Sequence, residues 1–230
     1  MSVELHQSHR WDLPPYEAQQ LQQALSQEIV TQDDFGDLAL IAGVEVAHSR
    51  FNDTLTVGVS LLTYPELQVV EKRVIEYQTK FPFIAELLSF REAPAIVAAL
   101  ETLSRRPDMV LIEGPGIAHA KGLGVASHVG VVMGLPTVGC AKATSVGSFV
   151  EPEVNAGSSS SLVWQGEIIG TVYRSKNRVA PLFISAGYRV SRETAARLVR
   201  ECCQGYRMPE PIRHAGNALA ETKRAAAAVG

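Results

Sequence analysis

Two apolar runs of strand length, each accompanied by a glutamate, constrain the fold of this chain more than any other feature. Residues 38–46 and 109–112 are almost entirely apolar, and such short continuous runs are typical of central strands buried on both faces. Glu45 interrupts the first run, and Glu113 directly follows the second. Because a carboxylate in or beside a buried strand is costly unless a cation pairs with it, both glutamates are candidates for a functional site.

The remaining pattern predicts an α/β fold with a mixed central sheet. The expected elements are helices near 15–30, 89–104, 125–133, 191–203 and from 213 onward, strands at 55–62, 67–75, 136–140 and 182–185, and a hairpin around 165–166. Ser191 is a candidate N-cap, and the serine-rich residues 153–161 are expected to form a surface loop. Strands come first and later alternate with helices, an order that predicts helices packed on both faces of the sheet.

Composition excludes a disordered chain. Of the 230 residues, 46% are apolar and 20% charged, and this length suits one large domain or two small ones. We expect a single domain over 1–230, with loosely ordered ends at 1–14 and 221–230. No apolar stretch reaches the roughly 18 residues that a membrane span needs, and the N-terminal segment lacks the apolar core of a signal peptide. The three cysteines form no C-x-x-C pair, so we expect reduced thiols, no zinc site and a cytoplasmic protein without membrane contacts.

Charge is distributed unevenly along the chain. The net charge is −3, yet residues 171–230 hold eleven basic and four acidic side chains. The near-neutral total argues against a protein that binds nucleic acid through its whole surface. The basic last quarter permits a local phosphate-binding face, and the alternative is a solvated helical surface.

A third glutamate, Glu92, suggests a metal site together with Glu45 and Glu113. Clustered carboxylates supply the hard oxygen ligands that Mg²⁺ or Mn²⁺ needs. Each glutamate also has a structural interpretation. Glu92 completes a capping box with Ser89, Glu113 can cap the loop that follows it, and Glu45 can point into solvent from an edge strand.

The glycine-rich residues 114–124 follow the second apolar run. Glycine after a strand suggests that the backbone approaches a ligand closely, although the segment matches neither a P-loop nor the dinucleotide fingerprint. It contains His119, and a lone loop histidine is more often a surface residue than a catalytic one. Lys142 follows the predicted strand 136–140. A strand end is a place where its ammonium can meet phosphate, but this signal is weak by itself.

Taken together, a set of short motifs resembles the endonuclease V family. In chain order they are 81–84 (FPFI), 88–92 (LSFRE), 107–114 (PDMVLIEG), 116–119 (GIAH), 123–128 (LGVASH), 136–139 (PTVG) with 141–142 (AK), 174–176 (RSK), 181–184 (PLFI) and 206–211 (YRMPEP). Each motif is weak alone, but the resemblance spans roughly residues 15–220 in the family's order.

The resemblance implies a ribonuclease-H-like fold and a repair nuclease. Members of the family use carboxylates and Mg²⁺ to hydrolyse a phosphodiester one nucleotide 3′ of deoxyinosine in DNA, or of inosine in RNA. Carried over, the metal ligands are Glu45, Glu92 and Glu113, and the further catalytic residues are Lys142 and His119. The implied cofactor is Mg²⁺, with Mn²⁺ as an alternative, and the implied partner is DNA or RNA that contains deaminated adenine. We expect the chain to be a monomer.

The same resemblance assigns substrate contacts. A wedge that separates the strands at the lesion falls on Pro82, Phe83 and Ile84. The flipped hypoxanthine falls in a pocket of backbone amides and small residues, near Leu88, Gly114, Gly116 and Gly124. An enzyme that reads the edge of a flipped base needs both a wedge and a pocket.

The chain also departs from the family pattern at the expected site. The family has aspartate where Glu45 and Glu113 stand and a polar side chain where Gly216 stands, and its wedge ends Pro-Gly where this chain has Ala85 and Glu86. Each glutamate adds one methylene, about 1.5 Å of reach. If these changes prevent turnover, the chain is a divergent relative that binds nucleic acid or another partner with weak or no nuclease activity.

Overall fold

The computed structural model describes residues 9–49 and 52–229 and contains one eight-stranded sheet. The strands are β1 (Leu40–His48), β2 (Thr54–Thr63), β3 (Val69–Gln78), β4 (Met109–Ile112), β5 (Thr137–Ala141), β6 (Ser159–Trp164), β7 (Glu167–Tyr173) and β8 (Leu182–Tyr188). Their order across the sheet is β3-β2-β1-β4-β5-β8-β7-β6. The central strands β1, β4 and β5 run parallel, whereas the strand pairs outside them are antiparallel. The sheet is therefore mixed, as predicted.

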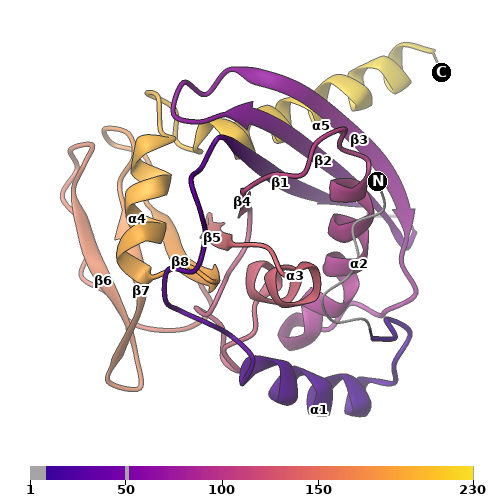
Figure 1. Ribbon diagram of the computed structural model, residues 1–230, viewed down its shortest axis with the longest axis horizontal. Coiled ribbons are helices and arrows are strands. Elements are labelled where there is room, and N and C mark those ends of the chain that lie inside the picture. Colours follow the sequence, from indigo (N-terminus) through magenta and orange to yellow (C-terminus); the bar gives the residue numbers. More distant parts are fainter. Residues whose placement is uncertain (1–8, 50–51, 230) are drawn as a thin grey trace.

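Helices cover both faces of this sheet (Figure 1). They are α1 (Pro15–Ser26), the 3₁₀ turn η1 (Ala85–Leu87), α2 (Leu88–Glu101), α3 (Val125–Met133), α4 (Arg192–Glu201) and α5 (Glu210–Val229). The core on one face joins β1 and β2 to α2 and α3, and the core on the other joins β1, β4 and β8 to α4 and the start of α5. This arrangement confirms the predicted packing of helices on both faces.

The alternation of side chains along β1 decides where its glutamate points. Ile41 belongs to the core under α4 and α5, and Val44 belongs to the core under α2 and α3. Gly43 faces the backbone of α5 at Pro211. Since neighbouring residues of a strand point to opposite faces, Glu45 lies on the α5 face, at the end of the apolar run.

Predictions about local polar residues had mixed outcomes. Ser89 does not begin a capping box: α2 begins at Leu88, and Ser89 Oγ lies 3.0 Å from Nδ1 of the buried His128. The predicted loop at 153–161 is confirmed over 153–158, whereas Ser159–Ser161 belong to β6, because an edge strand with one solvated side tolerates polar residues. Ser191 caps α4 as predicted, since its Oγ accepts a hydrogen bond from the Thr194 amide at 3.2 Å.

The chain ends are described in part. Residues 1–8 of the predicted loose N-terminal end lie outside the described residues. His9 and Trp11 pack against His128, with His9 Nε2 2.9 Å from His128 Nε2. At the other end α5 continues through 221–229. Within the part of the chain that the structure covers, helices are too short or too polar to cross a bilayer, and the three cysteines are free.

Candidate active site

Glu45 and Glu113 are neighbours at the point where the parallel pairing of β1 with β4 ends. The β1–β4 register pairs Val44 with Ile112, and the Glu113 amide donates to the Val44 carbonyl at 2.9 Å. Burial raises the pKa of the Glu113 carboxyl, and the charges of Glu45 and Glu92 raise it further against the opposing effect of Lys142. Glu45 and Glu92 therefore both lie close enough to Glu113 to disfavour its ionised form.

Lys142 supplies a positive charge to this carboxylate pair. It follows β5, and its Nζ donates to Glu45 Oε1 at 2.8 Å. Burial lowers the pKa of Lys142, but the hydrogen bond to Glu45 and the charges of Glu113 and Glu45 outweigh this effect and raise it. The ammonium stays protonated at neutral pH. Its segment is held by Arg207, whose guanidinium donates to the Lys142 carbonyl at 3.0 Å and to the Pro181 carbonyl at 3.1 Å.

Glu92 reaches the site from the opposite face of the sheet. It is in the second turn of α2, and its Oε1 lies 2.6 Å from Nε2 of His48 at the end of β1. Eleven per cent of the Glu92 side chain is exposed, against 31% for His48. Sequence reasoning missed His48. The available signal was strand alternation, which puts His48 on the same face as Val44, towards α2.

The carboxylates do not converge into a preformed cage. In the ranges 9–49 and 52–229, no group of three His, Cys, Asp or Glu side chains is placed so that it could hold one metal ion. The Lys142 ammonium and the His48 imidazole each engage one of the glutamates instead. Each of these two carboxylates is therefore already engaged by a partner within the protein.

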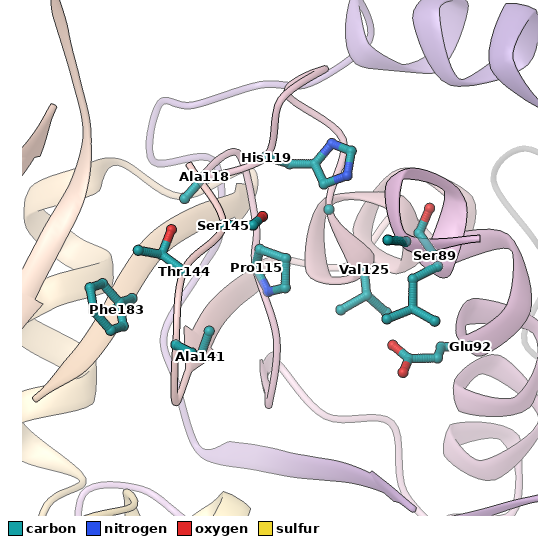
Figure 2. Close-up of a pocket in the computed structure, with 14 residues that line it drawn as sticks. Ser89, Glu92, Pro115, Ala118, His119, Val125, Ala141, Thr144, Ser145 and Phe183 are labelled. Atoms are coloured by element: carbon teal, nitrogen blue, oxygen red, sulfur yellow. The ribbon is translucent and has the colours of Figure 1, made fainter. Parts of the chain in front are cut away.

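A cavity of about 320 Å³ opens beside Glu92 (Figure 2). Small and apolar residues dominate its lining, which comprises Ala85, Leu88, Ser89, Glu92, Pro115, Ala118, His119, Gly124, Val125, Ala141, Ala143, Thr144, Ser145 and Phe183. Figure 2 shows α2 residues on one side and Phe183 of β8 on the other. Such a volume falls within the range of about 300–1,000 Å³ that is typical of small-ligand pockets.

The structure brings two of the predicted pocket residues to this cavity. Leu88 and Gly124 line it, whereas Gly114 and Gly116 do not, and Pro115 between them does. The Gly116 amide donates to Ser185 Oγ at 2.9 Å, so it is engaged within the protein. A Cβ on Gly116 would lie 2.0 Å from the Ala186 carbonyl oxygen, so glycine here lets the loop pack directly on β8.

His119 braces one wall of the cavity. Its Nδ1 accepts the Lys121 amide at 3.2 Å. Burial lowers the pKa of His119, although a hydrogen bond with the Glu86 backbone and the Glu86 charge act in the opposite direction. The imidazole is therefore neutral and joins the glycine-rich loop to the turn η1.

The predicted wedge lies beside His48, the partner of Glu92. Pro82, Phe83 and Ile84 connect β3 to η1, and 67% of Phe83 is exposed. The Phe83 ring meets the His48 ring edge-on at a centroid distance of 6.0 Å. Ile84 packs against the cluster of Phe81, Leu87 and Phe90 and so anchors the wedge to the core.

Comparison with known proteins assigns a family to this fold and site. The family model described as Endonuclease V matches residues 23–217. Endonuclease V from Dehalococcoides mccartyi is 41% identical over 221 residues, 96% of this chain and 99% of the relative. The crystal structure of endonuclease V from Streptomyces avermitilis matches with a TM-score of 0.87 at 29% identity, covering 99% of this chain and 100% of that one.

A further solved relative is a complex with nucleic acid. A variant of Ciona intestinalis endonuclease V, bound to a 23-mer DNA that contains an inosine followed by a ribo-adenosine, matches with a TM-score of 0.79 at 26% identity. The match covers 91% of this chain and 97% of that one. These likenesses confirm the predicted ribonuclease-H-like fold. On the strength of the family model and the relatives, the chain belongs to the endonuclease V family.

Proposed function

We propose that this protein is a metal-dependent endonuclease that hydrolyses a phosphodiester 3′ of deoxyinosine, or of inosine in RNA, in nucleic-acid repair. The observation that carries the proposal is the placement of Glu45 and Glu113 side by side on the neighbouring parallel strands β1 and β4, with the Lys142 ammonium 2.8 Å from Glu45. The complex of the Ciona relative with inosine-containing DNA supports the choice of substrate.

The donor chemistry of the site suits Mg²⁺ or Mn²⁺. Carboxylate oxygens are the ligands these ions prefer, and a divalent cation would offset the burial and the carboxylate repulsion that raise the pKa of Glu113. Glu45 and Glu113 would hold the ion, with Glu92 completing the set directly or through water. When bound, the metal activates water and neutralises charge on the phosphoryl oxygens.

The chain's own groups perform the remaining tasks. Lys142 is protonated and partly exposed, so its ammonium can bind a phosphate oxygen of the substrate. His48 holds the Glu92 carboxylate in place through its 2.6 Å contact. The neutral His119 keeps the cavity wall fixed rather than acting as a charged partner of phosphate.

The cavity and the wedge are suited to base recognition. An enzyme that reads a base inside a duplex must first extrude it, and an exposed aromatic ring can stack where the base has left. Phe83 is exposed beside the His48–Glu92 pair. The cavity, lined by Leu88 and Gly124, lies next to Glu92 and would take the flipped hypoxanthine.

A nicking assay tests the proposal. The purified chain is mixed with end-labelled strands that carry one deoxyinosine or one inosine, with Mg²⁺, with Mn²⁺ or with EDTA, and with unmodified strands as controls. We expect metal-dependent cleavage one nucleotide 3′ of the lesion. Tight binding of the inosine strand without cleavage, in folded protein with either metal, would instead support the divergent relative that binds without hydrolysis.

A further inference from the structure

Helix α5 lies unusually close to strands β1 and β2. A Cβ built on Gly43 would lie 2.0 Å from the carbonyl carbon of Pro211, and one on Gly58 would lie 2.4 Å from the carbonyl oxygen of Ala215. Side chains at these two strand positions would therefore collide with the helix backbone. The two glycines allow α5 to rest directly on the sheet, above the part of β1 that carries Glu45.

Because α5 lies this close to the sheet, its residue Gly216 lies against the carboxylate of Glu45. A Cβ built on Gly216 would lie 2.4 Å from Glu45 Oε2 and 3.2 Å from its carboxyl carbon. The three nearest heavy atoms to that position all belong to the Glu45 carboxylate. Glu45 is directly opposite Gly58 in the β1–β2 register, which explains why it faces this turn of α5. The carboxylate thus occupies the space of the side chain that residue 216 lacks.

Glycine at this position is not required by the backbone of the helix. Gly216 lies well inside α5, which runs from Glu210 to Val229, and its φ lies outside the left-handed region. Glycine is less favourable than alanine in a helix interior, and alanine is frequent elsewhere in this helix. The close approach of the Glu45 carboxylate is the contact that gives glycine an advantage here.

We propose that Gly216 is a positioning residue: by leaving room for the longer glutamate side chain, it directs the Glu45 carboxylate towards Lys142 and Glu113. Any side chain at 216 would displace Oε2 and with it Oε1, which accepts the Lys142 ammonium at 2.8 Å. The consequence for catalysis rests on the proposed nuclease function. The packing of Gly216 on Glu45 does not, and can be measured without substrate or metal.

A double-mutant cycle separates the packing of Gly216 on Glu45 from its consequence for catalysis. The proteins are wild type, Gly216→Ala, Glu45→Asp and the double variant, because aspartate withdraws the carboxylate by about 1.5 Å. Thermal unfolding is measured in EDTA. In the Glu45→Asp background, Gly216→Ala should raise Tm by about 2–4 °C through helix propensity. In the wild-type background the same change should lower Tm or leave it unchanged, because it displaces the carboxylate.

Asn217→Ala provides the matched control. Asn217 is exposed on the same helix next to Gly216, so its replacement should change Tm equally in both backgrounds. If Gly216→Ala also changes Tm equally in both backgrounds, the proposal is overturned. The comparison stays informative if Gly216→Ala folds poorly, because recovery of folding in the double variant is itself the predicted coupling.

Cleavage of a deoxyinosine strand is then measured with the same four proteins and with Mg²⁺. Gly216→Ala should slow cleavage at least tenfold relative to wild type, and its effect should be smaller in the Glu45→Asp background. Equal slowing in both backgrounds would overturn the positioning role. If no protein cleaves while the coupling in Tm persists, the nuclease function fails and the contact between Gly216 and Glu45 stands.

Discussion

The Nε2 atom of His48 lies 2.6 Å from Oε1 of Glu92, and this contact links the end of β1 to α2. Because 11% of the Glu92 side chain is exposed, its carboxylate depends on this partner. The contact places Glu92 at the edge of the cavity, next to the strand that carries Glu45. Glu92 is therefore held by a strand residue and does not form the helix cap that was the structural alternative to its predicted role as a metal ligand.

Replacing His48 tests this link. His48→Leu leaves the nearly buried Glu92 carboxylate without its donor and should lower the free energy of unfolding by about 1–3 kcal/mol. His48→Gln keeps an N–H donor and should lose less. Urea denaturation of both variants in EDTA gives the comparison. Equal stability of the two variants would mean that the hydrogen bond does not hold Glu92.

Removal of the Lys142 charge should affect activity far more than stability. The Lys142–Glu45 pair is partly exposed, at 39% and 23% of the two side chains, and such pairs contribute below about 1 kcal/mol. Lys142→Met should therefore unfold almost like wild type but cleave at least tenfold more slowly. Lys72→Met, which breaks the exposed pair of Lys72 with Glu221 at 3.2 Å, is the control. A similar loss of cleavage in both variants would contradict a specific role for Lys142.

Buried histidines should make stability fall with acid. Burial lowers the pKa of His128 well below its ordinary value, and burial also lowers the pKa of His9, its neighbour at 2.9 Å. The unfolded state binds these protons at higher pH than the folded state does. Stability is thus fully present above the unfolded pKa of about 6.5 and is lost as pH falls below it, by up to about 1.4 kcal/mol per pH unit for each histidine.

The His128→Gln variant isolates the contribution of His128 to this pH dependence, which is expected to be larger than that of His9. It should be less stable at pH 7.5, because the contact with Ser89 is lost. Its free energy of unfolding should fall less steeply than that of wild type between pH 7 and 5. Urea midpoints measured across this range provide the slopes, and parallel slopes would show that His128 does not titrate on unfolding.

The wedge should matter for duplexes. Phe83 is 67% exposed, so Phe83→Ala should leave Tm unchanged. Stacking of an aromatic ring on a base is worth about 1–3 kcal/mol, which predicts cleavage of an inosine duplex that is about 5–150-fold slower. A single strand needs no separation and should be cut with a smaller loss. An equal loss of cleavage rate on the duplex and on the single strand would contradict the role of Phe83 as a wedge.

Much of the fold follows from local sequence. The apolar runs at 38–46 and 109–112 became the central strands β1 and β4, because strands buried on both faces leave an unambiguous apolar pattern. The start of α5 was harder to predict from the sequence. The helix begins at Glu210 rather than at the predicted Arg213, since Pro211 occupies its first turn, where proline costs no hydrogen bond.

The candidate site was predictable where it depends on the two buried strands. Glu45 and Glu113 stand out because each adjoins a buried strand, and parallel neighbours bring them together. Contacts between distant segments were not predictable. The resemblance implied two separate departures, a longer acid at Glu45 and a missing polar group at Gly216, and the structure shows that these departures meet in one contact.

The most direct test of the account compares two glutamate-to-glutamine variants under single turnover with Mg²⁺ and a deoxyinosine strand. Glu113→Gln should cleave at least 100-fold more slowly than wild type, and its Tm in EDTA should be equal or higher, because burial and repulsion disfavour the ionised carboxyl. Glu101→Gln, at the exposed end of α2, is the matched control and should cleave like wild type. Cleavage by Glu113→Gln at the wild-type rate would contradict the assignment of the carboxylate pair as the catalytic centre.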